Sequence, residues 1–237
     1  HLAREDVGGV VNTHGTDTLE ETAYFLHAVL QPNKPVVLTC AMRPATSLQA
    51  DGPQNLADAV TVARTPGVQG VLAVCAGVVH GALDVQKLHS YRLDAFSSGD
   101  GGPVAYVEAG ALRQVRNWPV AGEKYAQAAI EMIASDAPWP QVDVVLNYAG
   151  ANALVVDALA ASGVRGLVVA GTGNGTVHAE LLAALLRAQA QGVAVRRTSG
   201  CALGRVLAAP GDELAHFEGL TPVKARIALM LELMASA

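Results

Sequence analysis

The chain has 237 residues, long enough for two domains, with a formal net charge of −5. Its acidic and basic residues are interspersed without a basic stripe, so we expect no nucleic-acid partner. The longest apolar run, residues 71–79, is far too short to cross a bilayer, so no membrane partner is expected. Half of the residues are hydrophobic and only 4% are aromatic, a composition typical of an α/β protein with buried strands.

The first part of the chain alternates short apolar runs with segments of helical periodicity. The expected strands cover residues 7–13, 35–40 and 70–75, and the expected helices cover residues 18–30 and 54–64. The first helix has its start marked by Thr18 and Glu21, which have the spacing of a capping box. Strands that alternate with helices become parallel neighbours, so this part predicts a doubly wound parallel sheet.

Later segments predict a second, smaller α/β domain. Residues 78–107 read as short strands and turns, and residues 118–140 as a connector that contains a helix over 123–134. The remaining elements are strands at 142–147, 166–170 and 193–198, and helices at 152–161, 176–190 and 222–234. The last helix should begin at Thr221 as cap, with Pro222 in the first helical position. The domains predicted are therefore residues 1–117 and residues 141–237.

Cysteine and histidine spacing gives no sign of a metal site or a disulfide framework. A C-x-x-C pair is absent, and Cys40 and Cys75 end apolar runs, where small buried hydrophobic residues are expected. This cysteine usage fits a reducing compartment. The histidines at 80, 89, 178 and 216 lack metal-ligand spacing, so we expect no metal and no cofactor.

The segment H-G-T-D-T at residues 14–18 is the strongest candidate for chemistry. It follows a predicted parallel strand and precedes a helix, which is where open α/β sheets bind ligands. The Thr16 hydroxyl could attack a substrate or position water, and the Asp17 carboxylate could hold an ammonium group. Threonine and aspartate are also common helix caps, and on spacing alone that role is the more frequent one.

Three neighbouring segments resemble the bacterial L-asparaginase and glutaminase-asparaginase family. They are G-V-V-N-T-H-G-T-D-T-L-E-E-T-A-Y-F-L at 9–26, K-P-V-V-L-T-C-A-M-R-P at 34–44, and A-D-G-P-Q-N-L at 50–56. The resemblance continues in N-Y-A at 147–149, the start of the family's C-terminal domain, and in G-T-G-N-G at 171–175. It therefore reaches from the first predicted strand into the second domain.

The resemblance implies a role for four residues. Thr16 matches the threonine of the acyl-transfer step, and Asp17 the residue that binds the α-amino group of the substrate. Ala41 matches a residue whose backbone lines the amide-binding pocket. Asn174 matches an asparagine that reaches the active site of a neighbouring subunit. The implied reaction is hydrolysis of the side-chain amide of L-asparagine to L-aspartate and ammonia by a threonine nucleophile.

Two departures from the family pattern bear on activity. The family's T-G-G-T-I-A stretch, which carries the primary nucleophile, has no match, and residues 1–6 read like the end of a helix. We therefore expect the chain to begin within a domain. Ser97 stands where we expect the family's lysine, and nothing in the sequence places Lys87 in the site instead. For Asp212 and Glu213, candidates for an acidic residue offered to an adjacent subunit, a solvated turn is the favoured interpretation.

Two functions stay open at this point. The chain is either part of an L-asparaginase-type amidohydrolase or a truncated or degenerate homologue that binds aspartate or asparagine without turnover. In both cases the partner is a small amino acid, and the resemblance implies a homotetramer built from two dimers. A cytoplasmic location is expected, with the periplasm as the alternative.

Overall fold

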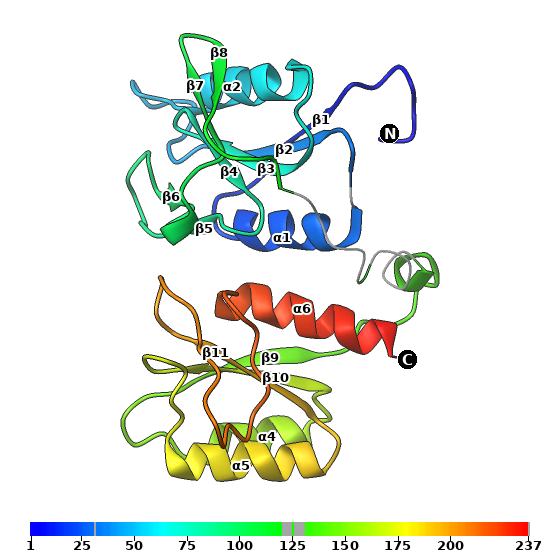
Figure 1. The fold of residues 1–237 in the computed structure, drawn as a ribbon, viewed down its shortest axis with the longest axis vertical. Helices are drawn as coiled ribbons and strands as arrows, with labels where there is room; N and C mark the ends of the chain where they lie inside the picture. Colours follow the sequence, from blue (N-terminus) through cyan, green and yellow to red (C-terminus); the bar gives the residue numbers. More distant parts are fainter. Residues whose placement is uncertain (31, 120–124, 126–130, 237) are drawn as a thin grey trace. The chain divides into compact units, whose positions relative to one another are not determined.

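The computed structural model describes residues 1–30, 32–119, 125 and 131–236. It divides into two compact units, His1–Ala126 and Gln127–Ala237, each considered by itself (Figure 1). This division falls inside the predicted connector, and the predicted domain limits at 117 and 141 stay predictions. Most of the helix expected over 123–134 lies outside the described residues, and residues 131–134 are helical.

The first unit contains a six-stranded sheet in the order β1-β2-β3-β4-β7-β8. Its strands are β1 (Val10–Thr13), β2 (Pro35–Thr39), β3 (Gly70–Cys75), β4 (Val78–Gly81), β7 (Ala105–Glu108) and β8 (Ala111–Gln114). The first three are parallel, and the others pair antiparallel. The antiparallel part begins where the chain reverses directly after β3. Ala76 and Gly77 make that reversal with φ of 51° and 74°. The predicted α/β class is confirmed, with a larger sheet that is mixed.

Two helices cover opposite faces of this sheet, as a doubly wound arrangement requires (Figure 1). Helix α1 (Leu19–Leu30) packs on the face that presents Val36 and Leu38. Helix α2 (Gly52–Arg64) packs on the face that presents Val37. Successive β2 side chains enter different cores, which explains why this strand is buried at every position.

A short hairpin lies outside the main sheet and is fixed on the α1 side. Strands β5 (Gln86–Lys87) and β6 (Phe96–Ser97) pair antiparallel, with Lys87 opposite Phe96. A 3-10 turn over Gly99–Gly101 follows. Phe96 is buried in the same cluster as Leu19 of α1. Because its apolar residues belong to that core, the hairpin holds its polar residues in defined positions.

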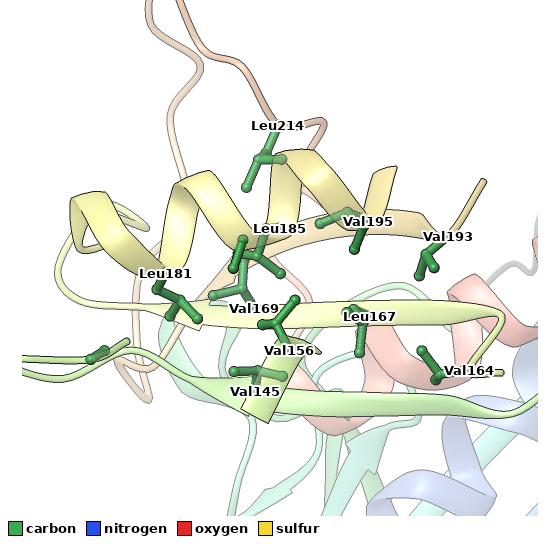
Figure 2. Close-up of a cluster of buried hydrophobic side chains, with 13 residues drawn as sticks. Val145, Val156, Val164, Leu167, Val169, Leu181, Leu185, Val193, Val195 and Leu214 are labelled. Atoms are coloured by element: carbon green, nitrogen blue, oxygen red, sulfur yellow. The ribbon is translucent and has the colours of Figure 1, made fainter. Parts of the chain in front are cut away.

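The second unit has three parallel strands in the order β11-β10-β9. Its elements are β9 (Val142–Leu146), α4 (Leu154–Ala161), β10 (Gly166–Gly171), α5 (Ala179–Ala190), β11 (Ala194–Ser199) and α6 (Pro222–Ala235). Figure 2 shows the core between the sheet and helices α4 and α5, built from buried valine and leucine side chains. Helix α6 lies on the other face (Figure 1). The prediction of a smaller α/β domain is confirmed.

Two helices of the second unit, α4 and α5, begin later than the sequence predicts. Helix α4 begins two residues late because the Asn152 side chain accepts a hydrogen bond from Leu154 N (3.0 Å) in the preceding turn. Helix α5 begins three residues late because Thr176 instead forms a bridge with Thr172. Helix α6 begins at Pro222 with Thr221 in the cap position, as predicted, and the Thr221 hydroxyl makes no capping hydrogen bond. Among the described residues, every helix falls short of the length and apolarity that a bilayer crossing requires.

Candidate active site

The loop after β1 is tied to both of its neighbouring elements. His14 N donates to Thr39 O (2.8 Å), which extends the pairing with β2. The His14 ring lies 2.8 Å from Gly15 O through Nδ1 and 2.9 Å from the Thr22 hydroxyl on α1 through Nε2. A neutral imidazole that donates through Nδ1 accepts at Nε2, so one tautomer satisfies both contacts. His14 therefore holds the loop between strand and helix.

Thr16, Asp17 and Lys87 form a closed set of polar contacts at the carboxyl end of β1. Lys87 Nζ donates to Thr16 Oγ1 (2.8 Å) and to Asp17 Oδ1 (2.7 Å). The Thr16 hydroxyl donates to Asp17 Oδ1 (3.2 Å). The Lys87 side chain is only 18% exposed, whereas that of Asp17 is 91% exposed. The Lys87 side chain is thus fixed by burial, while the Asp17 carboxylate faces solvent, where a ligand could reach it.

The residue that contacts Thr16 and Asp17 from the β5–β6 hairpin is Lys87. Lys87 lies on β5, and the antiparallel pairing with β6 places it opposite Phe96. The Ser97 hydroxyl accepts a hydrogen bond from Gly99 N (3.1 Å), so it stabilises the turn after β6. The chain therefore brings a lysine to Thr16 and Asp17 from a position that the sequence analysis did not assign to the site. Strands of two residues are too short to be recognised from periodicity.

The electrostatics of the set favour an ionised carboxylate. The hydrogen bond from the Lys87 ammonium holds the pKa of Asp17 below its ordinary value, and the positive charge and the Thr16 hydroxyl act in the same direction. Asp17 also lies two residues before the first residue of α1, near the helix end where the dipole favours negative charge. Asp17 is therefore suited to hold a cationic group of a ligand.

Replacing Lys87 with methionine should raise the pKa of the Asp17 carboxyl towards the ordinary value of about 3.9. The reason is that the substitution removes the main cause of the lowered pKa. Carboxyl ¹³C chemical shifts followed against pH measure this directly. Asp94, whose lowered pKa comes from Arg92, is the internal control and should not move. An Asp17 titration that is unchanged in Lys87→Met would contradict the contact.

Two side chains from the start of α2, Asp51 and Asn55, fix the loop that follows β2 through hydrogen bonds. Asp51 accepts hydrogen bonds from Met42 N (2.9 Å) and Arg43 N (3.0 Å). Asn55, only 3% exposed, donates to Cys40 O (2.9 Å) and accepts from Ala76 N (2.9 Å). Its amide also donates to Asp51 (3.1 Å). These contacts join the carboxyl ends of β2 and β3, and neither residue was singled out from the sequence.

Ala41 lies in this loop. It follows β2 by two residues and is exposed, between Cys40 and Met42, whose backbone groups are bound by Asn55 and Asp51. Since β1 and β2 are parallel neighbours, the loops that carry Thr16 and Ala41 leave the sheet at the same edge. A role of the Ala41 backbone in binding a substrate amide stays a prediction.

Asn174 and Asp212 lie in the second unit and both have partners there. The Asn174 amide donates to Leu207 O (3.0 Å) and accepts from Leu207 N (2.7 Å). Asp212 accepts from Arg197 (2.6 Å) and from Ala209 N (2.8 Å), and these contacts lower its pKa. Asp212 follows the turn at residues 210–211 directly and is exposed, and its contacts stabilise that turn. A role of Asn174 in a neighbouring subunit stays a prediction.

Replacing Gly171 with alanine should lower the free energy of unfolding of the second unit by about 1–3 kcal/mol, because the close approach leaves no room for a side chain. A Cβ atom at this position would lie 2.4 Å from the backbone carbon of Gly175, so the loop that carries Asn174 must shift. Gly173→Asn is the matched control, since its φ of 53° suits asparagine and no atom lies within 4 Å of the added Cβ. Denaturant unfolding measures the free energy of unfolding of both variants. If both differ from the unsubstituted protein by the same small amount, the expectation is refuted.

Within the described part of the chain, histidine, cysteine, aspartate and glutamate side chains form no group of three that could hold a metal ion. At the edge of the sheet, a hydroxyl, a carboxylate and an ammonium group are in mutual contact.

Family models match both units of the chain. Residues 1–120 match the family described as Asparaginase, N-terminal, and residues 141–236 match the Glutaminase/Asparaginase C-terminal domain. The chain belongs to the asparaginase family. The predicted family is thereby confirmed, and the set of Thr16, Asp17 and Lys87 lies in the half that matches the N-terminal model.

Curated relatives and a solved structure agree with this assignment. L-asparaginase 2 of Escherichia coli strain K12 is 37% identical over 240 residues, which cover 95% of this chain and 66% of the relative. Glutaminase-asparaginase of Pseudomonas fluorescens biotype A is 36% identical over 239 residues, covering 97% of this chain and 64% of the relative. A crystal structure of a probable cytoplasmic L-asparaginase from Campylobacter jejuni matches with a TM-score of 0.88 and 36% identity, covering 97% of this chain and 74% of that one. The chain thus spans slightly less than two thirds of the length of these two curated relatives.

Proposed function

We propose that this member of the asparaginase family takes part in hydrolysis of the side-chain amide of L-asparagine, which gives L-aspartate and ammonia. The observation that carries the proposal is the contact of Lys87 with both Thr16 and Asp17 at the carboxyl end of β1. The names of the relatives, L-asparaginase and glutaminase-asparaginase, support the same substrate class. A hydroxyl held between an ammonium group and a carboxylate is suited to proton transfer in acyl chemistry.

Asp17 binds the α-ammonium group of the substrate in the proposed complex. Its side chain is 91% exposed, and its lowered pKa keeps it ionised over the whole neutral range. The α-carboxylate of the substrate is attracted by the N-terminus of α1, where backbone N–H groups are directed outwards. Matching both charges of a small zwitterion fixes the orientation of its side chain in the crevice.

Thr16 and Lys87 serve the acyl-transfer step. A threonine hydroxyl attacks the amide carbon, ammonia leaves, and water then hydrolyses the resulting ester. The Lys87 ammonium group lies 2.8 Å from Thr16 Oγ1 and stabilises negative charge on that oxygen. Thr16 can therefore give its proton to the departing nitrogen while it takes one from the attacking threonine hydroxyl. In the hydrolysis step it passes a proton from the attacking water back to that threonine oxygen.

The family resemblance places the primary nucleophile on a T-G-G-T-I-A segment, so the test compares two proteins. One contains this chain together with such a segment, and the other is the chain alone. We expect the first to release ammonia from L-asparagine and the second to be inactive. If the first protein releases no ammonia but calorimetry shows that it binds L-aspartate, it is a binding homologue. If it neither turns over nor binds these amino acids, the proposal fails.

We also propose a homotetramer built from two dimers, as the family resemblance implies, in which Asn174 acts beside the active site of another subunit. Its contact with Leu207 would present the loop at residues 171–175 in a fixed shape. Light scattering measures the mass of the particle. A monomer in solution that hydrolyses L-asparagine at the full rate would rule out this role.

A further inference from the structure

The structure brings Cys40 and Cys75 together at the carboxyl edge of the first sheet. Cys75 is the last residue of β3, and Cys40 follows the last residue of β2. Thr39 pairs with Val74, so the two cysteines are the next neighbours on parallel strands. Their Sγ atoms are 3.1 Å apart, and both side chains are buried, with exposed fractions of 6% and 3%. The expectation of small buried hydrophobic residues is correct about burial but misses the pairing.

Hydrogen bonds on either side hold the two sulfur atoms next to each other. The Asn55 side chain joins Cys40 O to Ala76 N, at 2.9 Å for each contact. The Thr39 hydroxyl donates to Val74 O (2.8 Å) one residue earlier. Neighbouring strands lie about 4.8 Å apart, and disulfides span Cα separations of about 4.4–6.8 Å. Closing a bond between these sulfurs therefore needs side-chain rotation and little backbone movement.

The two thiols also differ in acidity. The contact with the Cys75 thiol lowers the pKa of Cys40, whereas the contact with Cys40 and burial raise the pKa of Cys75. Cys40 is the more exposed of the two. Since the thiolate is the nucleophile in thiol oxidation, Cys40 is the sulfur that reacts first and Cys75 the one that resolves.

We propose that Cys40 and Cys75 form an oxidisable dithiol site that takes hydrogen peroxide, a two-electron oxidant small enough for a nearly closed site. The Cys40 thiolate attacks one peroxide oxygen, the O–O bond breaks, and hydroxide leaves as a sulfenic acid forms. The hydroxide takes the Cys75 proton to give water. Cys75 sulfur then attacks Cys40 sulfur, the S–O bond breaks, and the second hydroxide takes a proton from solvent. The two thiols are oxidised to one disulfide, and peroxide is reduced to two waters.

The bond would cross-link the strand ends that frame the loop of Ala41. Cys40 precedes Ala41 directly, and Cys75 precedes the reversal at Ala76. The inference does not depend on the proposed function, because its readout is covalent and needs no substrate.

The test uses the Cys201→Ser variant, which removes the exposed third cysteine and leaves only the pair. The folded protein is treated with hydrogen peroxide, quenched, unfolded with an alkylating reagent present, and weighed intact. We expect a loss of two hydrogens, no alkylation, and full recovery of two alkylated thiols after reduction with dithiothreitol. The oxidised protein should also unfold at a higher temperature than the reduced one, because the cross-link constrains the unfolded chain.

The unsubstituted chain serves as the control for the oxidant, since its exposed Cys201 must lose its reactivity under the same treatment. A second control, Cys75→Ser in the Cys201→Ser background, should gain oxygen on Cys40 instead of losing two hydrogens. The proposal is overturned if both thiols still take up the alkylating reagent when Cys201 has reacted. It is equally overturned if the pair gains oxygen atoms without forming the bond.

Discussion

Replacing Lys87 with methionine should lower the rate of L-asparagine hydrolysis by about 100- to 1,000-fold, the usual cost of losing one charge-stabilising donor. Methionine has similar length and fills similar space but removes the ammonium group that contacts Thr16 Oγ1 and Asp17 Oδ1. The KM should rise as well, because Asp17 loses the partner that fixes its carboxylate. Ammonia release from L-asparagine measures both, in the protein that also contains the T-G-G-T-I-A segment.

The matched control is Lys34→Met, which removes another partly buried lysine from the same unit. Lys34 donates to Leu2 O (3.0 Å) and Arg4 O (2.6 Å), away from the loop after β1. Its kcat should stay within about twofold of the unsubstituted protein, the scale of a surface substitution. A Lys87→Met protein that keeps its rate within tenfold of this control would show that the lysine has no part in the reaction.

Replacing Asn55 with alanine should lower the free energy of unfolding of the first unit by about 2–4 kcal/mol. The substitution leaves Cys40 O and Ala76 N without their side-chain partner at a buried position, and each orphaned group costs about 1–3 kcal/mol. Asp51 also loses a donor, so the loop that carries Ala41 should become less ordered. Urea unfolding measures the first effect, and amide hydrogen exchange at Met42 and Arg43 measures the second.

Asn33→Ala is the control for this experiment, because Asn33 is an exposed asparagine in the same unit. Its free energy of unfolding should change by no more than about 0.5 kcal/mol. If Asn55→Ala and Asn33→Ala unfold at the same urea concentration, the Asn55 side chain does not hold the two strand ends together.

Much of the fold could be predicted because its elements carry strong local signals. Residues 70–75 form a continuous apolar run and are β3, buried at every position. The stripe that begins at Leu19 gives α1, whose side chains at 19 and 23 are fully buried. The antiparallel half of the larger sheet was less accessible, because its pairing depends on a two-residue reversal at Ala76 and Gly77. A reversal of only two residues gives a weak sequence signal.

In the candidate site, too, residues marked by their sequence neighbours could be predicted, and residues brought in from distant segments could not. Thr16 and Asp17 could be located because a strand end and a helix start are both readable from nearby residues. Lys87 is separated from them by about 70 positions and comes from a strand of two residues. Asn55 looks like an ordinary polar residue of an amphipathic helix until the ends of β2 and β3 are placed beside it. Contacts of this kind arise from packing of the whole unit.

The central claim is that Thr16, Asp17 and Lys87 form a site that recognises a small amino acid by its charges. A crystal structure with L-aspartate bound to the protein that also contains the T-G-G-T-I-A segment tests it most directly. The expected complex has the α-ammonium group on the Asp17 carboxylate and the side-chain carboxyl beside Thr16 Oγ1, with Lys87 still in contact with both protein side chains. L-Aspartate bound where none of these three residues touches it would contradict the claim.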